Sequence, residues 1–479
     1  MKMWSGRLKQ PLDPAFEQWQ RSFPFDRVLI EEELAASTAH AHALAGAGVL
    51  SAEEADRIVA ALKEIGEEVQ RDLRLLESAE AEDVHYFVEL MLVAVVGELG
   101  YKLHSGRSRN EQIATDLRLF ARKSIDQLQA ALTNLLQALV SRAEDAGESA
   151  MPAYTHSQRA EPVLVAHWLL AYFEMFSRDL DRLVDCRARL NVCPLGSGAV
   201  AGSGLKLDRE ATAAELGFGG ITHNSIDATS DRDFVLEFLH GCSFIALHLS
   251  RLAEEMVLFA TAEFGFITLP DQYSTGSSAL PQKKNPDAME LIRGKAGRIC
   301  AAAHSIEMTV KSLPLAYNKD LQESQEPLLK TAPEMLTIVE IATGFLKELK
   351  FNFERMHQAA STGYMNAIAA ANYLARKGLP FRLAHKTIGE VVQLCLERKC
   401  AIEDLSAEEL RKYSPLFGED FKEAITLKNI LAGPDLPGGT APAQVKQALQ
   451  AAKAKLSTRQ VQHQYSQGIP TKEVEYESA

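Results

Sequence analysis

The chain has 479 residues, of which 64 are acidic and 51 are basic, and its formal net charge is −13. This length is too great for one hydrophobic core, so about three domains are expected. The acidic balance argues against a nucleic-acid-binding protein, because such proteins normally carry a basic surface.

The cysteine pattern and the N-terminus both favour a cytoplasmic protein. The six cysteines show neither a C-x-x-C pair nor a metal-binding spacing with histidine, which predicts reduced thiols. The first residues, MKMWSGRLKQ, are not followed by an apolar signal core, so no secretion signal is expected. Apolar runs such as MLVAVVG are too short to span a bilayer, so no membrane partner is expected.

Helical periodicity dominates the sequence. Ser108 and Glu111 form an S-x-x-E capping box, which predicts the start of a long helix, and Gly147 lies just past its end. Within this segment apolar residues recur at steps of four and three: Ala121, Ile125, Leu128, Leu132, Leu135 and Leu139. Such a stripe is typical of a helix packed in a bundle.

Four more long helices are expected: 163–190, from the S-x-x-D cap at Ser230 to about 263, from Pro286 onward, and 325–349. Their apolar residues lie on more than one face, which favours burial in an assembly larger than one chain. We therefore predict an all-α fold of three helical domains. They are an N-terminal domain (1–106), a central long-helix bundle (107–355) that assembles into a multi-subunit core, and a C-terminal domain with a polar, partly disordered tail (356–479).

The segment YSTGSSALPQKKNPDAMELIRGKAGRI places hydroxyls and cations just before a helix. Asn285 is expected as the N-cap, with Pro286 at the first helical position and Asp287 in the first turn. Ser277, Ser278, Lys283 and Lys284 would then precede a helix N-terminus, which favours bound anions. The loop is long enough to close over a ligand. The alternative is a solvated linker.

Two further clusters are ambiguous when taken singly. HSGRSRNEQ places Arg107, Arg109 and Asn110 at the start of the long helix, where guanidinium groups suit carboxylates but also occur in solvent. PAYTHSQRAEP places Thr155 and His156 on a loop bracketed by prolines, where a histidine could move protons.

Metal and dinucleotide sites are not predicted. The histidine pairs at 40 and 42 and at 240 and 248 lack a third ligand. The G-x-G in CPLGSGAVAGSG does not follow a strand, so it is interpreted as a loop.

Taken together, the clusters resemble one family. GSSALPQKKNP is similar to the signature loop of the fumarase/aspartase superfamily. HSGRSRNEQ, YTHSQRAEP, SDRDFV and LPLAYNKDLQE narrow the resemblance to the argininosuccinate lyase family, in the right order from MWSGR to about residue 456. The resemblance implies cleavage of argininosuccinate to arginine and fumarate in arginine biosynthesis, by base-catalysed elimination of a C–N bond.

The resemblance also implies roles for individual residues. Ser277 matches the catalytic base, and Lys283 holds the carboxylate whose charge grows, with Asn285 as a second ligand. His156 matches the usual acid, oriented by Glu290, although a bound water could deliver the proton instead. Substrate-contacting positions are Ser22, Arg109, Asn110, Thr155, Arg232, Thr275, Asn285, Tyr317 and Gln322.

The family forms homotetramers whose active sites draw on three subunits. It implies no metal or organic cofactor, because the substrate carboxylate is the electron sink. One departure concerns binding: the family's LQEDKE is here LQESQE, so Gln325 stands where a substrate-binding lysine is usual. The alternatives are a sister lyase acting on adenylosuccinate, aspartate or malate, and a non-catalytic structural protein like the related lens crystallins.

Overall fold

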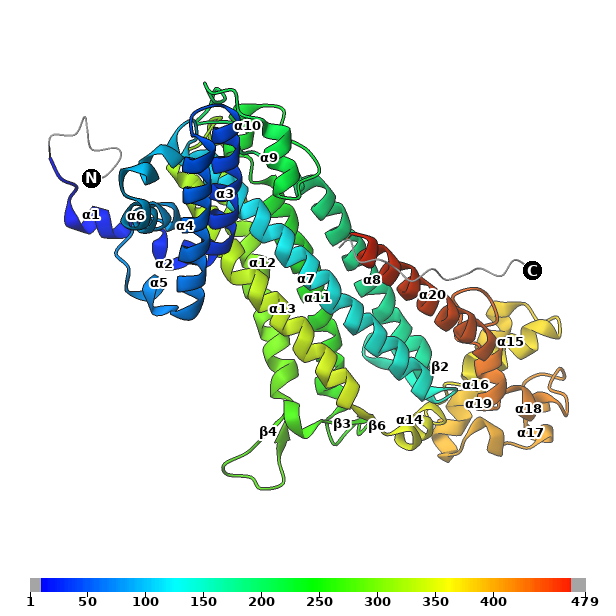
Figure 1. Cartoon of the computed structure of the whole chain (residues 1–479). Helices are drawn as coiled ribbons and strands as arrows, with labels where there is room; N and C mark the ends of the chain where they lie inside the picture. Colours follow the sequence, from blue (N-terminus) through cyan, green and yellow to red (C-terminus); the bar gives the residue numbers. More distant parts are fainter. Residues whose placement is uncertain (1–9, 467–479) are drawn as a thin grey trace. The chain divides into compact units, whose positions relative to one another are not determined.

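The computed structural model describes residues 10–466, and Figure 1 shows that helices make up most of them. The predicted all-α class is confirmed. The strands of the described residues form three two-stranded antiparallel sheets. The predicted polar tail is helical as far as Ser466, and its remainder lies outside the described residues.

Contacts divide the chain into two compact units. Unit 1 holds Met1–Ala130, Asp179–Leu247 and Lys295–Ile338, and unit 2 holds Ala131–Arg178, His248–Gly294 and Val339–Ala479. The boundaries fall within five long helices: α7 (Arg109–Ala146), α8 (Val165–Leu190), α11 (Asp233–Phe259), α12 (Asp287–Val310) and α13 (Gln325–Glu348). These are the five long helices that the sequence predicts. The three predicted domains are not tested by this division and remain a prediction.

Helix α7 begins where its capping residues place it. The Glu111 carboxylate accepts the Ser108 N–H at 3.0 Å, and Ser108 Oγ accepts the Asn110 N–H at 3.3 Å. All members of the predicted apolar stripe are buried: Ala121, Ile125, Leu128, Leu132, Leu135 and Leu139. Gly147 has a φ of 53°, a value that glycine adopts without steric cost, and so it ends the helix.

Helix α11 starts later than the sequence suggests. Asp231 Oδ1, not Ser230, accepts the Asp233 N–H at 2.8 Å. Ser230 is the last residue of α10 (Ser225–Ser230), and its hydroxyl donates to the Ile226 carbonyl. The aspartate is the better cap here because the serine hydroxyl is already bonded within the preceding helix.

Unit 1 also contains the N-terminal helices, packed around buried apolar residues. In α4, a complete capping box joins Ser51 and Glu54, and Ile58, Leu62 and Ile65 are buried. The elements of unit 1 whose bounds are not given above are α1 (Pro14–Trp19), α2 (Phe23–Asp26), η2 (Arg27–Leu29), α3 (Ile30–Gly46), α4 (Ala52–Arg71), α5 (Arg74–Ser78), α6 (Val84–Val96), η3 (Gly97–His104), α9 (Arg209–Glu215) and η5 (Lys319–Ser324).

Unit 2 contains all the named strands and a C-terminal helical core. That core buries Leu374, Ile388, Cys395, Phe417 and Phe421, among others. The elements of unit 2 are β1 (Ala150–Thr155), β2 (Gln158–Leu164), β3 (Ile267–Thr268), η4 (Asp271–Tyr273), β4 (Thr275–Gly276), β5 (Lys284–Asn285), β6 (Lys350–Phe351), α14 (Phe353–Ala360), α15 (Ala367–Arg376), α16 (Phe381–Arg398), η6 (Ile402–Asp404), α17 (Ala407–Arg411), α18 (Phe421–Ala424), α19 (Leu427–Ala432) and α20 (Pro442–Ser466).

One helical stretch in the described part, Val84–His104, is long and apolar enough to cross a membrane by length and composition. It joins α6 and η3, so it is longer than the apolar run considered in the sequence. Core helices of water-soluble proteins meet the same criterion.

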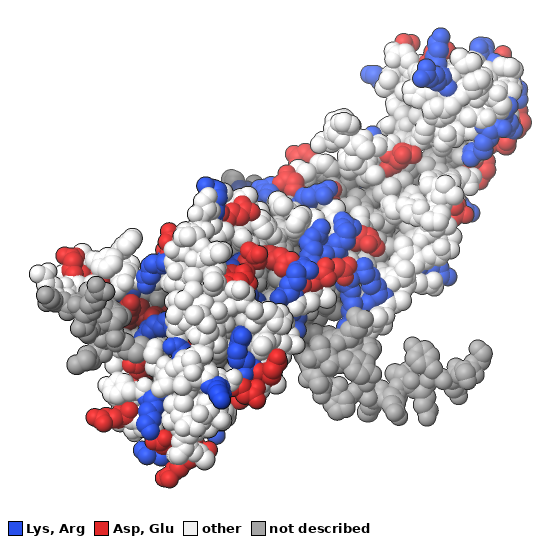
Figure 2. All heavy atoms as spheres, turned by 90° about the horizontal axis from the view of Figure 1, so that it is seen from above, with Lys and Arg blue, Asp and Glu red and all other residues white. Residues whose placement is uncertain are grey.

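Charged side chains of both signs are intermixed on the face drawn in Figure 2. An anion approaching that face would therefore meet local cations rather than a broad basic field.

Candidate active site

The signature segment forms a small hairpin in unit 2. Thr275 pairs with Asn285 and Gly276 pairs with Lys284, so β4 and β5 join the two ends of an exposed loop. Figure 1 shows this hairpin beside the β4 label, leading into α12. The loop between the strands carries Ser277 and Lys283, so both side chains sit on a projection that is paired only at its base.

Asp287 fastens the base of this hairpin to α12. Its Oδ2 accepts the Thr275 hydroxyl at 2.7 Å and the Thr275 N–H at 3.1 Å. The hydrogen bond from the Thr275 hydroxyl is the main reason that the pKa of Asp287 is lowered. Asn285 contributes a weaker bond, since its Nδ2 lies 3.4 Å from Thr275 Oγ1.

The start of α12 differs by one residue from the sequence prediction. The helix begins at Asp287, and the Pro286 carbonyl accepts the N–H groups of Met289 and Glu290. Pro286 thus occupies the cap position expected for Asn285. The Asn285 side chain bonds to Thr275 instead, because the strand pairing turns it toward the hairpin.

The hydroxyl of Ser277 accepts two backbone hydrogen bonds. The N–H groups of Ala279 and Leu280 donate to its Oγ at 3.3 and 3.1 Å. Donors aimed at an oxygen favour its anionic form. Lys283 is exposed, whereas Lys284 donates to the Leu269 carbonyl at 2.5 Å and also pairs with Asp271.

His156 lies on the turn of the β1–β2 hairpin, also in unit 2. Thr155 pairs with Gln158, leaving His156 and Ser157 as a two-residue turn with φ values of 53° and 57°. Two positive values identify a type I′ turn, which usually carries Asn-Gly. The predicted proline-bracketed loop is therefore wrong, because both of its arms are strands. Thr155 and His156 are exposed.

Within unit 2 the hairpin β4–β5, which carries Ser277, lies apart from the hairpin β1–β2, which carries His156. Figure 1 draws β2 and β4 in different places. Glu290, the expected partner of His156, lies exposed on α12 and approaches Arg293 at 4.0 Å. The predicted pairing of His156 with Glu290 stays a prediction.

Unit 1 holds a second group around Arg109 and Ser22. The Arg109 guanidinium forms an ion pair with Asp83, which also caps α6 by accepting the Tyr86 N–H at 2.7 Å. Burial alone would raise the pKa of Asp83, but Arg109 and His85 hold it below its usual range. Ser22 is buried and bonds through its side chain to Asp26.

Arg232 is the largest fully buried side chain of unit 1. Its Nε donates to Ser324 Oγ at 3.0 Å and its Nη1 to the Asp231 carbonyl at 2.7 Å. Its Nη2 is buried without a hydrogen-bond partner among the described residues. Burial lowers the pKa of Arg232 to about 10. A cation with a free buried donor is suited to an anionic group.

The remaining unit 1 candidates lie near these residues or on the same helix as Arg109. Tyr317 interacts electrostatically with both Arg232 and Asp83, and burial raises its pKa. Gln322 donates to the Gln20 carbonyl at 3.1 Å, close in sequence to Ser22. Asn110 donates to the Ala199 carbonyl at 3.3 Å. Gln325 is buried, and its Oε1 has no hydrogen-bond partner in the described chain.

The candidate residues therefore fall into two sets. Unit 1 carries Ser22, Arg109, Asn110, Arg232, Tyr317 and Gln322. Unit 2 carries Thr155, His156, Thr275, Ser277, Lys283, Asn285 and Glu290.

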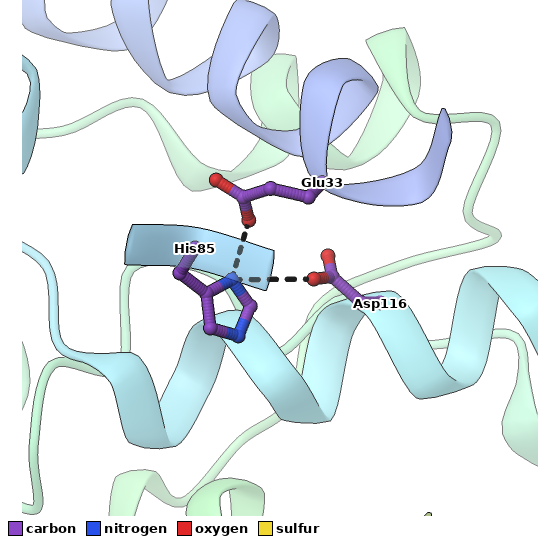
Figure 3. A group of neighbouring side chains, drawn as sticks. All are labelled: Glu33, His85 and Asp116. Atoms are coloured by element: carbon purple, nitrogen blue, oxygen red, sulfur yellow. Dashed lines mark hydrogen bonds and ion pairs between the residues drawn. The ribbon is translucent and has the colours of Figure 1, made fainter. Parts of the chain in front are cut away.

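A buried charged cluster in unit 1 was not predicted from the sequence. His85 Nδ1 lies 2.9 Å from Glu33 Oε2 and 3.6 Å from Asp116 Oδ2, as Figure 3 shows. Despite burial, His85, Arg107 and Ser37 lower the pKa of Glu33 to about 2. Burial and the charge of Glu33 raise the pKa of Asp116 well above its usual value.

This trio offers one nitrogen and two carboxylates within 4.8 Å of one another, a ligand set that a divalent cation could use. Glu33, however, already accepts hydrogen bonds from Ser37 and Gln112 and lies 3.9 Å from Arg107. These partners account for its charge without an ion. The histidine pair at 40 and 42 diverges: His40 bonds to the Ser105 carbonyl, whereas His42 bonds to Glu215.

Sequence reasoning did not name Asp26, which bonds to Ser22, or Asp83, which pairs with Arg109. It placed Asp287 in the first helical turn but did not predict its bond to Thr275. Local capping patterns could have indicated Asp83, since it precedes an apolar helical run. The pairing of Asp83 with Arg109 could not be predicted, because it joins positions that no local pattern connects.

Comparisons with known proteins agree along most of the chain. A family model described as lyase matches residues 6–301, and one described as argininosuccinate lyase C-terminal matches residues 364–432. An argininosuccinate lyase from Koribacter versatilis is 56% identical over 464 residues, covering 97% of this chain and 99% of the relative. One from Heliobacterium mobile is 45% identical over 456 residues, covering 95% and 99%.

A solved structure of EDDS lyase in complex with formate has the same fold, with a TM-score of 0.85 and 27% sequence identity. The match covers 96% of this chain and 93% of that chain. The 56% identity to the Koribacter versatilis relative over 97% of this chain, together with both family matches, shows the relationship. The chain belongs to the argininosuccinate lyase family.

Proposed function

We propose that this chain is an active lyase that splits argininosuccinate into arginine and fumarate. The observation that carries the proposal is the 56% identity to an argininosuccinate lyase over 97% of the chain. The signature segment, with Ser277 and Lys283 on one exposed hairpin loop, supports a working site rather than a structural homologue.

The proton to be removed lies on carbon beside a carboxylate and is weakly acidic, so the site has to stabilise developing negative charge. We assign Ser277 as the base. The N–H groups of Ala279 and Leu280 on its Oγ, together with the Lys283 cation on the same loop, would favour the deprotonated hydroxyl. Lys283 and Asn285 would hold the substrate carboxylate whose charge grows.

We assign His156 as the acid that protonates the leaving nitrogen, with Glu290 orienting it. Its place on a tight turn fixes the backbone on both sides, so the imidazole can be aimed without a flexible loop. A bound water is the alternative donor. With either donor, the leaving nitrogen gains a proton as the C–N bond breaks, and arginine is released.

The unit 1 candidates and Thr155 with Thr275 are proposed to bind the substrate. Arg232 is suited to a substrate carboxylate by its buried, unpartnered Nη2. The full set of proposed substrate contacts is Ser22, Arg109, Asn110, Thr155, Arg232, Thr275, Asn285, Tyr317 and Gln322.

We further propose a homotetramer with active sites shared between subunits. Large apolar side chains are exposed on the long helices of the single chain: Val184, Phe244, Leu247, Leu258, Leu291 and Met308. Such surfaces mark interfaces. A site shared between subunits would also explain why the candidate residues of one chain fall into two sets, one in unit 1 and one in unit 2. We also propose a cytoplasmic location and a role in arginine biosynthesis.

The test is fumarate release, followed by its ultraviolet absorbance, from argininosuccinate, adenylosuccinate, aspartate and malate in parallel. Release from argininosuccinate alone is expected. Release from another substrate alone would replace this proposal with a sister lyase, and no release from any would favour a structural protein. Light scattering on the same sample is expected to give the mass of four chains.

A further inference from the structure

The C-terminus of α16 brings two cysteines of unit 2 into contact. Lys399 has a left-handed conformation, with φ 55° and ψ 45°, and ends the helix. The Cys400 N–H donates to the Cys395 carbonyl at 3.1 Å, and the Lys399 N–H donates to the Leu396 carbonyl at 3.4 Å. These two bonds define a Schellman motif, in which the side chains at the positions of Cys395 and Cys400 touch.

The two thiols therefore meet because of local backbone geometry. Cys400 packs against the buried cluster that contains Cys395, and the two side chains are within hydrogen-bonding reach. Burial, and then the contact with Cys400, raise the pKa of Cys395 to about 11. Tyr364 Oη donates to the Cys400 carbonyl at 3.0 Å and so holds the outer residue in place.

The two thiols differ in access. Cys395 is fully buried, whereas Cys400 is partly exposed and lines a cavity of about 620 Å³ with Met365, Asn366 and Tyr364. Small solutes can therefore reach Cys400 but not Cys395. The guanidinium of Arg398 is close enough to Cys400 to interact with it electrostatically.

We propose that Cys395 and Cys400 form a dithiol site that hydroperoxides oxidise to an intramolecular disulfide. The Cys400 thiolate attacks a peroxide oxygen, the O–O bond breaks, and the leaving oxygen takes the thiol proton. Cys395 sulfur then attacks the resulting sulfenic acid, the S–O bond breaks, and the hydroxyl leaves as water with the Cys395 proton. Two thiols and one hydroperoxide thus give one disulfide, one alcohol or water, and one further water.

The proposal does not depend on the lyase activity, since neither cysteine is among the candidate site residues. Other thiols are placed differently. Cys186, Cys193 and Cys242 are buried, and Cys300 is partly exposed on α12. Cys300 is therefore the matched control, because it has comparable access but is not held in a Schellman contact with a second thiol.

The test treats the reduced full-length protein with hydrogen peroxide, blocks free thiols by alkylation, and digests with trypsin without reduction. Arg398 and Lys399 lie between the two cysteines, so trypsin separates them unless a disulfide joins the peptides. The expected product is a linked pair about 2 Da lighter than the two reduced peptides together. Cys300→Ser is expected to leave its yield within about twofold, because this thiol takes no part.

Cys395→Ser gives a second measurement. Without the resolving thiol, sulfenic acid at Cys400 is expected to accumulate several-fold over the native chain, detected with a dimedone probe. Finding Cys400 as sulfinic acid while Cys395 stays open to alkylation in the native chain would overturn the proposal. So would disulfides that join Cys400 of two different chains.

Discussion

Thr275 Oγ1 donates a hydrogen bond of 2.7 Å to Asp287 Oδ2, and the Thr275 N–H donates to the same oxygen at 3.1 Å. One carboxylate thus joins the first strand of the signature hairpin to the first turn of α12. The hairpin loop that carries Ser277 is anchored at this point.

Replacing this anchor is expected to slow catalysis more than it affects folding. Asp287→Ala removes both bonds to Thr275, so the hairpin should sample orientations in which Ser277 and Lys283 are misplaced. We expect kcat to fall about tenfold or more, because misplacement of catalytic groups is costly. Glu254→Ala is the control, since Glu254 also binds a side chain of α12, Arg293, but not the hairpin. Equal kcat values for the two variants would contradict an anchoring role.

Ser277→Ala is expected to lower turnover more than about a hundredfold while substrate binding is retained, because the proposed base is removed. Ser278→Ala is the matched control: the neighbouring serine is exposed on the same loop, and we expect less than about a threefold change. Steady-state fumarate release and substrate binding by calorimetry measure both effects. A loss under about tenfold for Ser277→Ala would assign the proton abstraction to another group.

Two histidine–glutamate pairs with the same separation allow a test of burial. His85–Glu33 and His42–Glu215 are both 2.9 Å apart, but the first pair is buried and the second has side chains 48% and 37% exposed. His85→Ala removes one charged partner of the buried Glu33 carboxylate, and breaking a buried ion pair typically costs about 3–5 kcal/mol. His42→Ala is expected to cost less than about 1 kcal/mol. Urea unfolding at one protein concentration measures both, and similar values would argue against a structural role for the buried cluster.

Asp26 gives a prediction for pH dependence. Burial and the charge of Asp83 raise its pKa from 3.8 to about 7 in the folded chain. The folded state therefore binds the proton more tightly than the unfolded state, and the stability that this provides is fully present below pH 4 and lost as the pH rises through 7. Between these limits the wild type should lose about 2–4 kcal/mol from this group.

Asp26→Asn should remove that loss. We expect the variant to gain stability relative to the wild type as the pH rises from 5 to 8, as judged from denaturant unfolding at both values. A stability difference between the two proteins that does not change with pH would show that Asp26 does not titrate in this range.

The helical class and the five long helices were predictable because their periodic apolar stripes are local signals. The stripe from Ala121 to Leu139 needed no knowledge of its partners. Helix starts were less certain. Ser230 is a residue type that often caps helices, yet Asp231 is the cap of α11 because the Ser230 hydroxyl is bonded within α10. The β1–β2 hairpin was missed because its turn contains neither asparagine nor glycine.

The candidate site was accessible to sequence reasoning only as far as motifs extend. Ser277, Lys283 and His156 carry recognisable patterns. The contacts of Ser22, Arg109 and Thr275 with carboxylates carry no such pattern, since residues such as Asp83 and Arg109 meet only after folding. The buried trio of Glu33, His85 and Asp116 comes from three helical segments, and no local spacing relates its members.

At the turn of His156 and Ser157, thermal stability and catalytic turnover favour different residues. Both residues hold a left-handed backbone that asparagine and glycine adopt with less strain, so His156→Asn and Ser157→Gly would relax the hairpin. Directed evolution that selects only for thermal stability would favour such replacements, and His156→Asn would remove the imidazole. Engineering of this scaffold should therefore begin from a screen in which every round also scores turnover.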